Sequence, residues 1–378
     1  MDLVALMGPL RRARATWVGA ALWFMGCAPE IPGRTIEVWT DRSNADGIVG
    51  VDVRFTSERN QALILVDAAP LTSLETIVDP DGALVLSWED WAPPNPRSLT
   101  WSVFAMGSDS ALNWPVREAD GPLQPGRWTF AYSTLDEEYR YLGRQDVEVT
   151  VITKVDPDLT SGTLPVTLFV ANDPTAPDLT GVIDTAVLRF QEIWADAGIT
   201  VDVEIESVDI DPGIPDPSDG DAMYVDLAER ANGRVVVVLA EQIVRADGTN
   251  SRLFGKVGSI PNALTPTKRG ALAVSWLAHA GANGAFGGDE ARLLGETLAH
   301  EVGHYAGLFH PVESGYDAWD ALDDTPECSR GPLCDDALGA QLMYPYPLCD
   351  GLPDPNCDPQ GELTPQQIAV LNRYVGVD

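Results

Sequence analysis

Basic side chains are scarce in this sequence. Its 378 residues include 24 lysines and arginines but 57 aspartates and glutamates, which gives a formal net charge of −33. Nucleic acid is therefore not an expected partner, because its phosphates would be repelled. The acidity favours solubility and weak self-association, although some carboxylates could instead bind calcium. Nothing in the sequence indicates an oligomeric state.

Two kinds of enzyme motif are also absent. The chain has no G-x-x-x-x-G-K-[ST] phosphate loop and no G-x-S-x-G nucleophile elbow. Internal repeats and low-complexity tracts are missing as well. The sequence therefore does not predict P-loop phosphate chemistry or the serine chemistry of an α/β-hydrolase.

The N-terminus carries only a short apolar run. Arginines at positions 11, 12 and 14 precede an apolar stretch at 15–25, which is too short to span a bilayer comfortably but has the length of the apolar region of an export signal. Residues 24–27 resemble a bacterial lipobox, which implies that Cys27 becomes the lipidated first residue of the mature chain. We expect an exported protein, either anchored to the cell envelope (outer membrane) by this lipid alone or secreted. A plain signal peptide cut elsewhere is the alternative.

Cysteine is rare too. There are five cysteines, and lipidation of Cys27 would leave four, clustered near the C-terminus. The four are Cys328, Cys334, Cys349 and Cys357. In an exported chain such a cluster predicts two disulfides, with three possible pairings among which the sequence does not choose. A zinc site built from four thiolates is the alternative, but the tight C-x-x-C pairs typical of such sites are missing.

The chain is long enough for two folded domains after a signal segment at 1–27. Residues 28–155 contain short runs in which apolar and polar residues alternate, such as 51–55 and 147–151, together with a turn signal at 79–82. This pattern predicts an all-β sandwich. The segment contains no histidine or cysteine, so we expect an accessory or binding domain without chemistry.

The second domain, 156–378, has a different pattern. Strand, helix and strand follow one another there as in a βαβ unit, and a further helix and strand come after it. The predicted elements are a strand at 164–170, a helix at 182–197 with Gly198 after its end, a strand at 199–205, a helix at 221–231 and a strand at 235–239. This half of the chain is predicted to be α/β in character.

Histidine is scarce, and its placement is the most informative feature of the sequence. Only four histidines are present, and three lie within residues 300–310, HEVGHYAGLFH. A helix capped by Asp289 would place His300 and His304 on one face, because residues four apart are neighbours on a helix. Glu301 would then lie close enough to engage a metal-bound water without being a ligand.

A third histidine completes the pattern. Gly307 can end the helix in a left-handed conformation, after which the chain can turn back and supply His310 as a ligand. Three protein ligands leave a fourth position for water, which is typical of a catalytic zinc site. His279 lies outside the motif and is expected to be a surface or core histidine. The alternatives are a helix with solvated histidines and a site that binds metal without turnover.

HEVGHYAGLFH resembles the H-E-x-x-H-x-x-G-x-x-H signature of the metzincin metallopeptidases. Within that clan the chain is most similar to the pappalysin-like group, through Asp-Thr-Pro at 324–326 and Leu-Thr-Pro-Gln-Gln at 363–367. The resemblance covers about 160–378, is strong only over 289–370, and says nothing about the N-terminal domain.

The resemblance implies an α/β (α+β) catalytic domain with a mixed sheet, an active-site helix and a Met-turn at Met343. It also implies a substrate pocket near Tyr344 and Tyr346, although the group usually has Asn where Gln341 stands here and a Met-x-Tyr sequence, so it does not settle which tyrosine approaches the metal. Relatives bind calcium near the Asp-Thr-Pro loop. The corresponding residues here are Asp317, Asp320, Asp323 and Asp324, for which a solvated acidic loop is the alternative.

Together these patterns predict a zinc-dependent endopeptidase that hydrolyses extracellular proteins or peptides, with Glu301 as general base. The substrate is expected to bind in an extended conformation beside 270–277, interpreted as an edge strand, with a plain internal strand as the alternative. A catalytically inactive cell-surface binding protein on the same scaffold is the second hypothesis for function.

Overall fold

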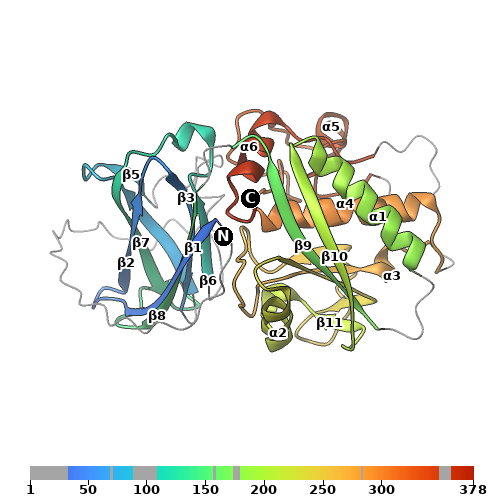
Figure 1. The fold of residues 1–378 in the computed structure, drawn as a ribbon, viewed down its shortest axis with the longest axis horizontal. Helices are drawn as coiled ribbons and strands as arrows, with labels where there is room; N and C mark the ends of the chain where they lie inside the picture. The colour runs from blue at the N-terminus through green and yellow to red at the C-terminus, as the bar shows by residue number, and fades with distance from the viewer. Residues whose placement is uncertain are drawn as a thin grey trace.

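The computed structural model describes residues 33–68, 71–87, 109–155, 159–172, 179–281, 284–348 and 359–378. These residues form an all-β unit followed by a mixed α/β unit (Figure 1). The predicted signal segment and Cys27 lie outside the described residues. None of the helices in the described ranges has the length and apolar character that a membrane span requires.

Two antiparallel four-stranded sheets build the N-terminal unit. In β2 (Ile48–Phe55) every second residue is buried, as expected for a strand with one face on a core. The inward side chains of both sheets share one core, in which the rings of Trp114, Trp128 and Phe130 meet. The first sheet has the order β1 (Arg34–Arg42), β8 (Asp146–Val155), β3 (Arg59–Asp67) and β6 (Asp109–Trp114). The second sheet has the order β2, β7 (Gly126–Leu135), β4 (Leu71–Val78) and β5 (Leu84–Ser87). A 3-10 turn, η4 (Glu118–Asp120), precedes β7 in the chain.

A mixed five-stranded sheet forms the centre of the second unit. Its order is β10 (Ile199–Val208), β9 (Gly162–Ala171), β12 (Val235–Ala240), β15 (Leu272–Ser275) and β14 (Gly255–Val257). Only β14 runs antiparallel to its neighbour within this sheet. Alternate side chains of β12 enter two different cores, with Val237 on one face of the sheet and Val238 on the other. The α/β class predicted from the sequence is confirmed.

Helices cover both faces of this sheet. α1 (Thr180–Ala195) and α4 (Gly288–Tyr305) contribute to the larger core, and α2 (Ala222–Ala231) packs on the opposite face. The predicted βαβ unit is present, because β9 and β10 pair in parallel and α1 connects them. The remaining elements are α3 (Trp276–His279), α5 (Gly331–Leu338), α6 (Pro365–Arg373), a 3-10 turn η5 (Pro217–Asp219), and the small parallel pair β11 (Gly213–Pro215) and β13 (Gln242–Val244).

The prediction that 270–277 forms an edge strand is wrong. β15, which occupies its centre, lies between β12 and β14 and is buried along its whole length. The edge strand on this side of the sheet is the three-residue β14. So short a strand leaves no periodic signal in the sequence.

The helix that carries the histidine motif begins slightly earlier than predicted. Its N-cap is Gly287, not Asp289. The Glu290 carboxylate accepts a hydrogen bond from the Gly287 amide at 2.9 Å, so a side chain inside the first turn reaches back to the start of the helix. Asp289 lies within that first turn, where a negative charge interacts favourably with the helix dipole.

The two units share a continuous apolar contact. Leu63, Leu65 and Ile152 from the first sheet belong to the same core cluster as residues of the C-terminal segment. At this junction the buried Arg34 side chain bonds the carbonyl of Val375 and the carboxylate of Asp378. The C-terminus accordingly lies between the two units (Figure 1). The β unit therefore packs directly against the α/β unit.

Gly295 allows α1 and α4 to cross closely. A Cβ atom at this position would lie 2.5 Å from the carbonyl oxygen of Ala186 and 2.7 Å from the Cβ of Arg189. We predict that Gly295→Ala lowers the free energy of unfolding by about 1–3 kcal/mol, because two packed backbones must separate. Thermal or denaturant unfolding measures this change.

Gly288→Ala is the matched control, since it makes the same substitution in the same helix where the new methyl group meets open space. It should leave stability unchanged or raise it slightly. Equal stability of the two variants would contradict the close crossing.

Candidate metal centre

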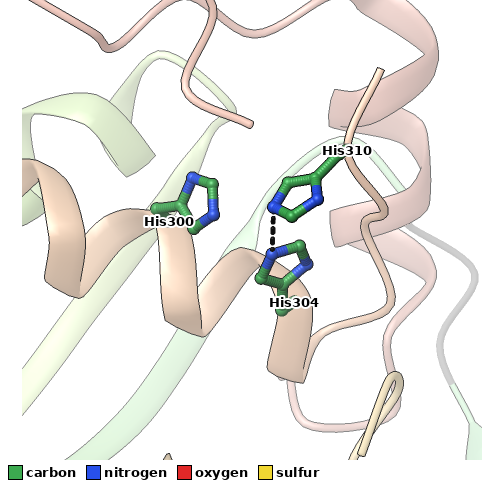
Figure 2. A group of neighbouring side chains, drawn as sticks. All are labelled: His300, His304 and His310. Atoms are coloured by element: carbon green, nitrogen blue, oxygen red, sulfur yellow. Dashed lines mark hydrogen bonds between the residues drawn. The ribbon is translucent and has the colours of Figure 1, made fainter. Parts of the chain in front are cut away.

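α4 and the turn after it bring three imidazoles together. His300 and His304 lie one turn apart on the helix, and Gly307, whose φ is +107°, turns the chain so that His310 faces them (Figure 2). The ring centroids are 4.6, 4.6 and 5.3 Å apart. A potential ligand nitrogen from each ring lies within 4.8 Å of the other two.

Each of these rings is oriented by a hydrogen bond at its Nδ1 atom. The three pairs are His300 with the carbonyl of Leu342 (2.7 Å), His304 with the carbonyl of Leu308 (2.6 Å) and His310 with the carboxylate of Glu313 (3.1 Å). Carbonyl and carboxylate oxygens accept hydrogen bonds, so each Nδ1 donates its proton. The Nε2 atoms are thereby left with the lone pairs that a metal ion needs.

Two of these lone pairs face each other at short range. The Nε2 atoms of His304 and His310 are 3.1 Å apart. When both rings carry a proton at Nδ1 alone, this contact is unfavourable by itself and becomes favourable when a cation lies between the nitrogens.

Burial also keeps two of the ligand candidates neutral. It lowers the pKa of His300 to about 3 and that of His304 well below its ordinary value, and the charges of neighbouring imidazoles lower both further. Neutral imidazole is the form that binds metal. The three histidines therefore fit a zinc ion with three protein ligands and one open position.

Glu301 lies beside the triad and lines the same cavity. Burial raises the pKa of its carboxyl to about 8, an effect that Lys256 opposes and Asp216 reinforces. Gly255 of β14 lets the carboxylate approach the sheet, because a Cβ there would lie 2.5 Å from the Cγ of Glu301. The carboxylate is thus held between the helix and the edge strand.

Met343 packs beneath the helical turn that carries the ligands. It is fully buried, and a Cβ atom at Gly303 would lie 2.7 Å from its sulfur. The preceding residue, Leu342, supplies the carbonyl that orients His300. This segment therefore supports the helix and fixes one ligand ring at the same time.

The two tyrosines predicted for the pocket differ in position. Tyr344 lines the cavity of about 440 Å³ next to the triad, whereas Tyr346 is not among its lining residues. The hydroxyl of Tyr344 donates to Asp335 at 2.6 Å, and that of Tyr346 donates to the carbonyl of Ser314 at 3.1 Å. The Tyr346 ring lies 6.0 Å from that of Tyr344, centroid to centroid, and its place in a substrate pocket stays a prediction.

The aspartates suggested for calcium do not converge. The four are Asp317, Asp320, Asp323 and Asp324. Asp320 accepts a hydrogen bond from the Thr325 hydroxyl, and Asp324 accepts one from the Thr364 hydroxyl at the start of α6. In the described part of the chain, the histidine triad is the one group of three or more ligand residues that comes together. Calcium binding stays a prediction without a converging ligand set.

One disulfide is present among the clustered cysteines. Cys328 and Cys334 are bonded, with their Cα atoms 5.5 Å apart. Cys349 and Cys357 lie outside the described residues. The alternative of a zinc site made from all four thiolates is wrong, because two of the sulfurs are bonded to each other.

His279 is a core histidine, which was one of the two positions expected for it. Its Nδ1 lies 2.6 Å from the carbonyl of Ser275, and its Nε2 lies 2.8 Å from the hydroxyl of Thr297 on α4. Burial lowers its pKa to about 4. Its role is to connect the end of β15 to the helix.

Three residues of the site were missed by the sequence analysis, namely Gly255, Lys256 and Glu313. Burial by itself would raise the pKa of Glu313, but the hydrogen bond from His310 and the charge of Lys256 help to outweigh it, so that the pKa is lowered. Glu313 lies three residues after His310, and this short spacing is the feature of the sequence that could have indicated a contact between the two side chains. No local pattern marks Gly255 and Lys256, because their place depends on how β14 lies beside α4.

The sequence matches no protein-family model and no curated protein. Similar solved structures include metalloproteinase-II from Bacteroides fragilis (14% identity, 60% of this chain and 62% of that one, TM-score 0.35). Another is a zinc-dependent peptidase from Methanocorpusculum labreanum (13% identity, 54% of this chain and 99% of that one, TM-score 0.33). The chain thus spans under two thirds of the first neighbour. At these scores neither neighbour assigns an activity to it.

We predict that Glu313→Gln weakens zinc binding by roughly ten- to a hundredfold, because the Nδ1 proton of His310 loses its charged acceptor. Competition with a chromophoric chelator measures the dissociation constant. Glu229→Gln, a matched change at an exposed position on α2, should leave the constant as it is in the unaltered protein. Identical zinc affinity in the two variants would show that Glu313 does not contribute to zinc binding.

Proposed function

We propose that this chain is a zinc-dependent endopeptidase of the metzincin type, in its pappalysin-like group, and that it cleaves extracellular proteins or peptides. The observation that carries the proposal is the set of three Nδ1-anchored imidazoles whose Nε2 atoms point together beside a buried glutamate. The export signal predicted for the N-terminus agrees with a substrate outside the cell, either in the envelope around a lipid-anchored enzyme or beyond it.

His300, His304 and His310 would hold the zinc ion. When bound, zinc supplies a Lewis acid that lowers the pKa of a coordinated water and polarises a carbonyl group. The carbonyls of Leu342 and Leu308 would keep two of the rings in place without moving during turnover.

Glu301 would carry the proton. Its carboxylate accepts a proton from the attacking water and later gives it to the nitrogen of the leaving amine. A carboxyl group whose pKa burial has raised is better matched to both tasks near neutral pH than an ordinary glutamate. The Gly255 backbone would hold it in reach of both atoms.

The substrate would bind along β14. This strand has a strand neighbour on one side only within its sheet, and its three residues line the cavity. An extended peptide can pair with such an edge through backbone hydrogen bonds. Pairing would bring one peptide bond past Glu301, because Gly255 of this strand touches that side chain.

We predict that Glu301→Gln keeps one zinc ion per chain while cleavage of casein falls by at least about a hundredfold, since the proton carrier is lost. Zinc content and peptide release measure the two properties. Asp289→Asn makes the same chemical change at an exposed position of α4 and should retain activity.

A chelator should abolish cleavage by the unaltered protein, and zinc should restore it. Zinc-loaded protein that cleaves neither casein nor peptides would instead support the inactive binding protein. Full activity of the Glu301→Gln variant would contradict the role of this residue.

A further inference from the structure

Two cationic side chains lie in the wall of the cavity beside the triad. The chain contains three lysines, and Lys256 is the one that lines the cavity, whereas Lys154 is buried in the β unit and Lys268 is exposed elsewhere. Arg252 lines the cavity as well, with a φ of +58° that is uncommon for a residue with a side chain. In a chain of net charge −33, this local pairing of cations is distinctive.

Two of the three acidic residues of the cavity wall are engaged by partners other than these cations. Glu296 forms ion pairs with Arg189 (3.2 Å) and Arg292 (2.8 Å). Glu313 is engaged by a hydrogen bond from the Nδ1 of His310 (3.1 Å), and Glu301 is the third acidic residue of the wall. Over the described ranges, neither Arg252 nor Lys256 takes part in an ion pair. No ion pair within the described residues therefore occupies either cation, and the carboxylates of Glu301 and Glu313 lie in the same cavity wall as Lys256.

Lys256 occupies a central place on the surface where a substrate would pair. It follows Gly255, which touches Glu301, and it belongs to the edge strand β14. It lines the same cavity as Glu301 and the three histidines. The ammonium group is thus in the wall of the cavity in which the bond would be cut.

We propose that Lys256, assisted by Arg252, binds a carboxylate of the substrate close to the scissile bond and makes the enzyme selective for peptides that are acidic there. The carboxylate can come from an aspartate or glutamate side chain or from a free C-terminus. The proposal rests on the peptidase activity proposed above and names the substrate class of the same site.

Charge recognition at this site is compatible with the acidic surface of the protein. Exposed charges further away than about 8 Å are largely screened at physiological ionic strength. A carboxylate inside the cavity would experience chiefly the two nearby cations and the metal. A charge-assisted hydrogen bond there is shorter and stronger than a neutral one.

The test uses zinc-loaded full-length protein and internally quenched peptides. One pair of peptides differs only by Glu or Gln next to the cleaved bond, and a second pair ends two residues after it in a carboxylate or an amide. We expect kcat/KM to favour the carboxylate member of at least one pair by about tenfold. The pair that shows the preference identifies the source of the carboxylate.

Lys256→Gln should reduce that preference to near unity, and Lys256→Glu should reverse it toward a matched peptide with Lys at the same position. Lys268→Gln, which removes the same charge outside the cavity, should keep the preference. Zinc content and thermal unfolding establish that the variants are folded.

Unaltered protein that cleaves both members of each pair equally would overturn the proposal, and that result needs no variant. A uniform loss for every peptide in Lys256→Gln would also overturn it, because the lysine would then act on catalysis in general. Failure to cleave any peptide or casein would overturn the peptidase function itself, which is a distinguishable result.

Discussion

The arrangement of three imidazole protons is the constraint on which the rest of the site depends. Each Nδ1 proton is given to a fixed oxygen, so three lone pairs are forced into the same small volume. That arrangement is unfavourable in an empty protein and favourable around a cation. The roles proposed for the buried glutamate, the cavity and the edge strand all depend on an ion bound between these three nitrogens.

Several contacts of the fold keep the three histidines in this arrangement. α4 is pressed against α1 through Gly295, and its ligand-bearing turn rests on Met343 through Gly303. The C-terminal segment that supplies Met343 continues into the junction with the β unit, where Arg34 binds the chain end. The N-terminal unit therefore packs against the α/β unit although it supplies no residue to the triad.

The sequence predicted what local spacing determines. The ligand-bearing helix, the bend at Gly307 and the βαβ unit follow from periodicity and glycine placement. It could not identify β14 as the edge, because three residues carry no period and strand order is a tertiary property. The hydrogen bonds that fix the hydroxyls of Tyr344 and Tyr346, and the Glu290 contact that moves the helix start to Gly287, likewise depend on the tertiary fold, which spacing does not encode.

The most direct measurement is X-ray absorption at the zinc edge on protein loaded with one zinc ion per chain. The geometry predicts three imidazole nitrogens at about 2.0–2.1 Å together with one oxygen from water, and loss of one nitrogen in a His310→Ala variant. A first shell with sulfur ligands, or one that is the same in that variant, would contradict the convergence of His300, His304 and His310 on a single ion.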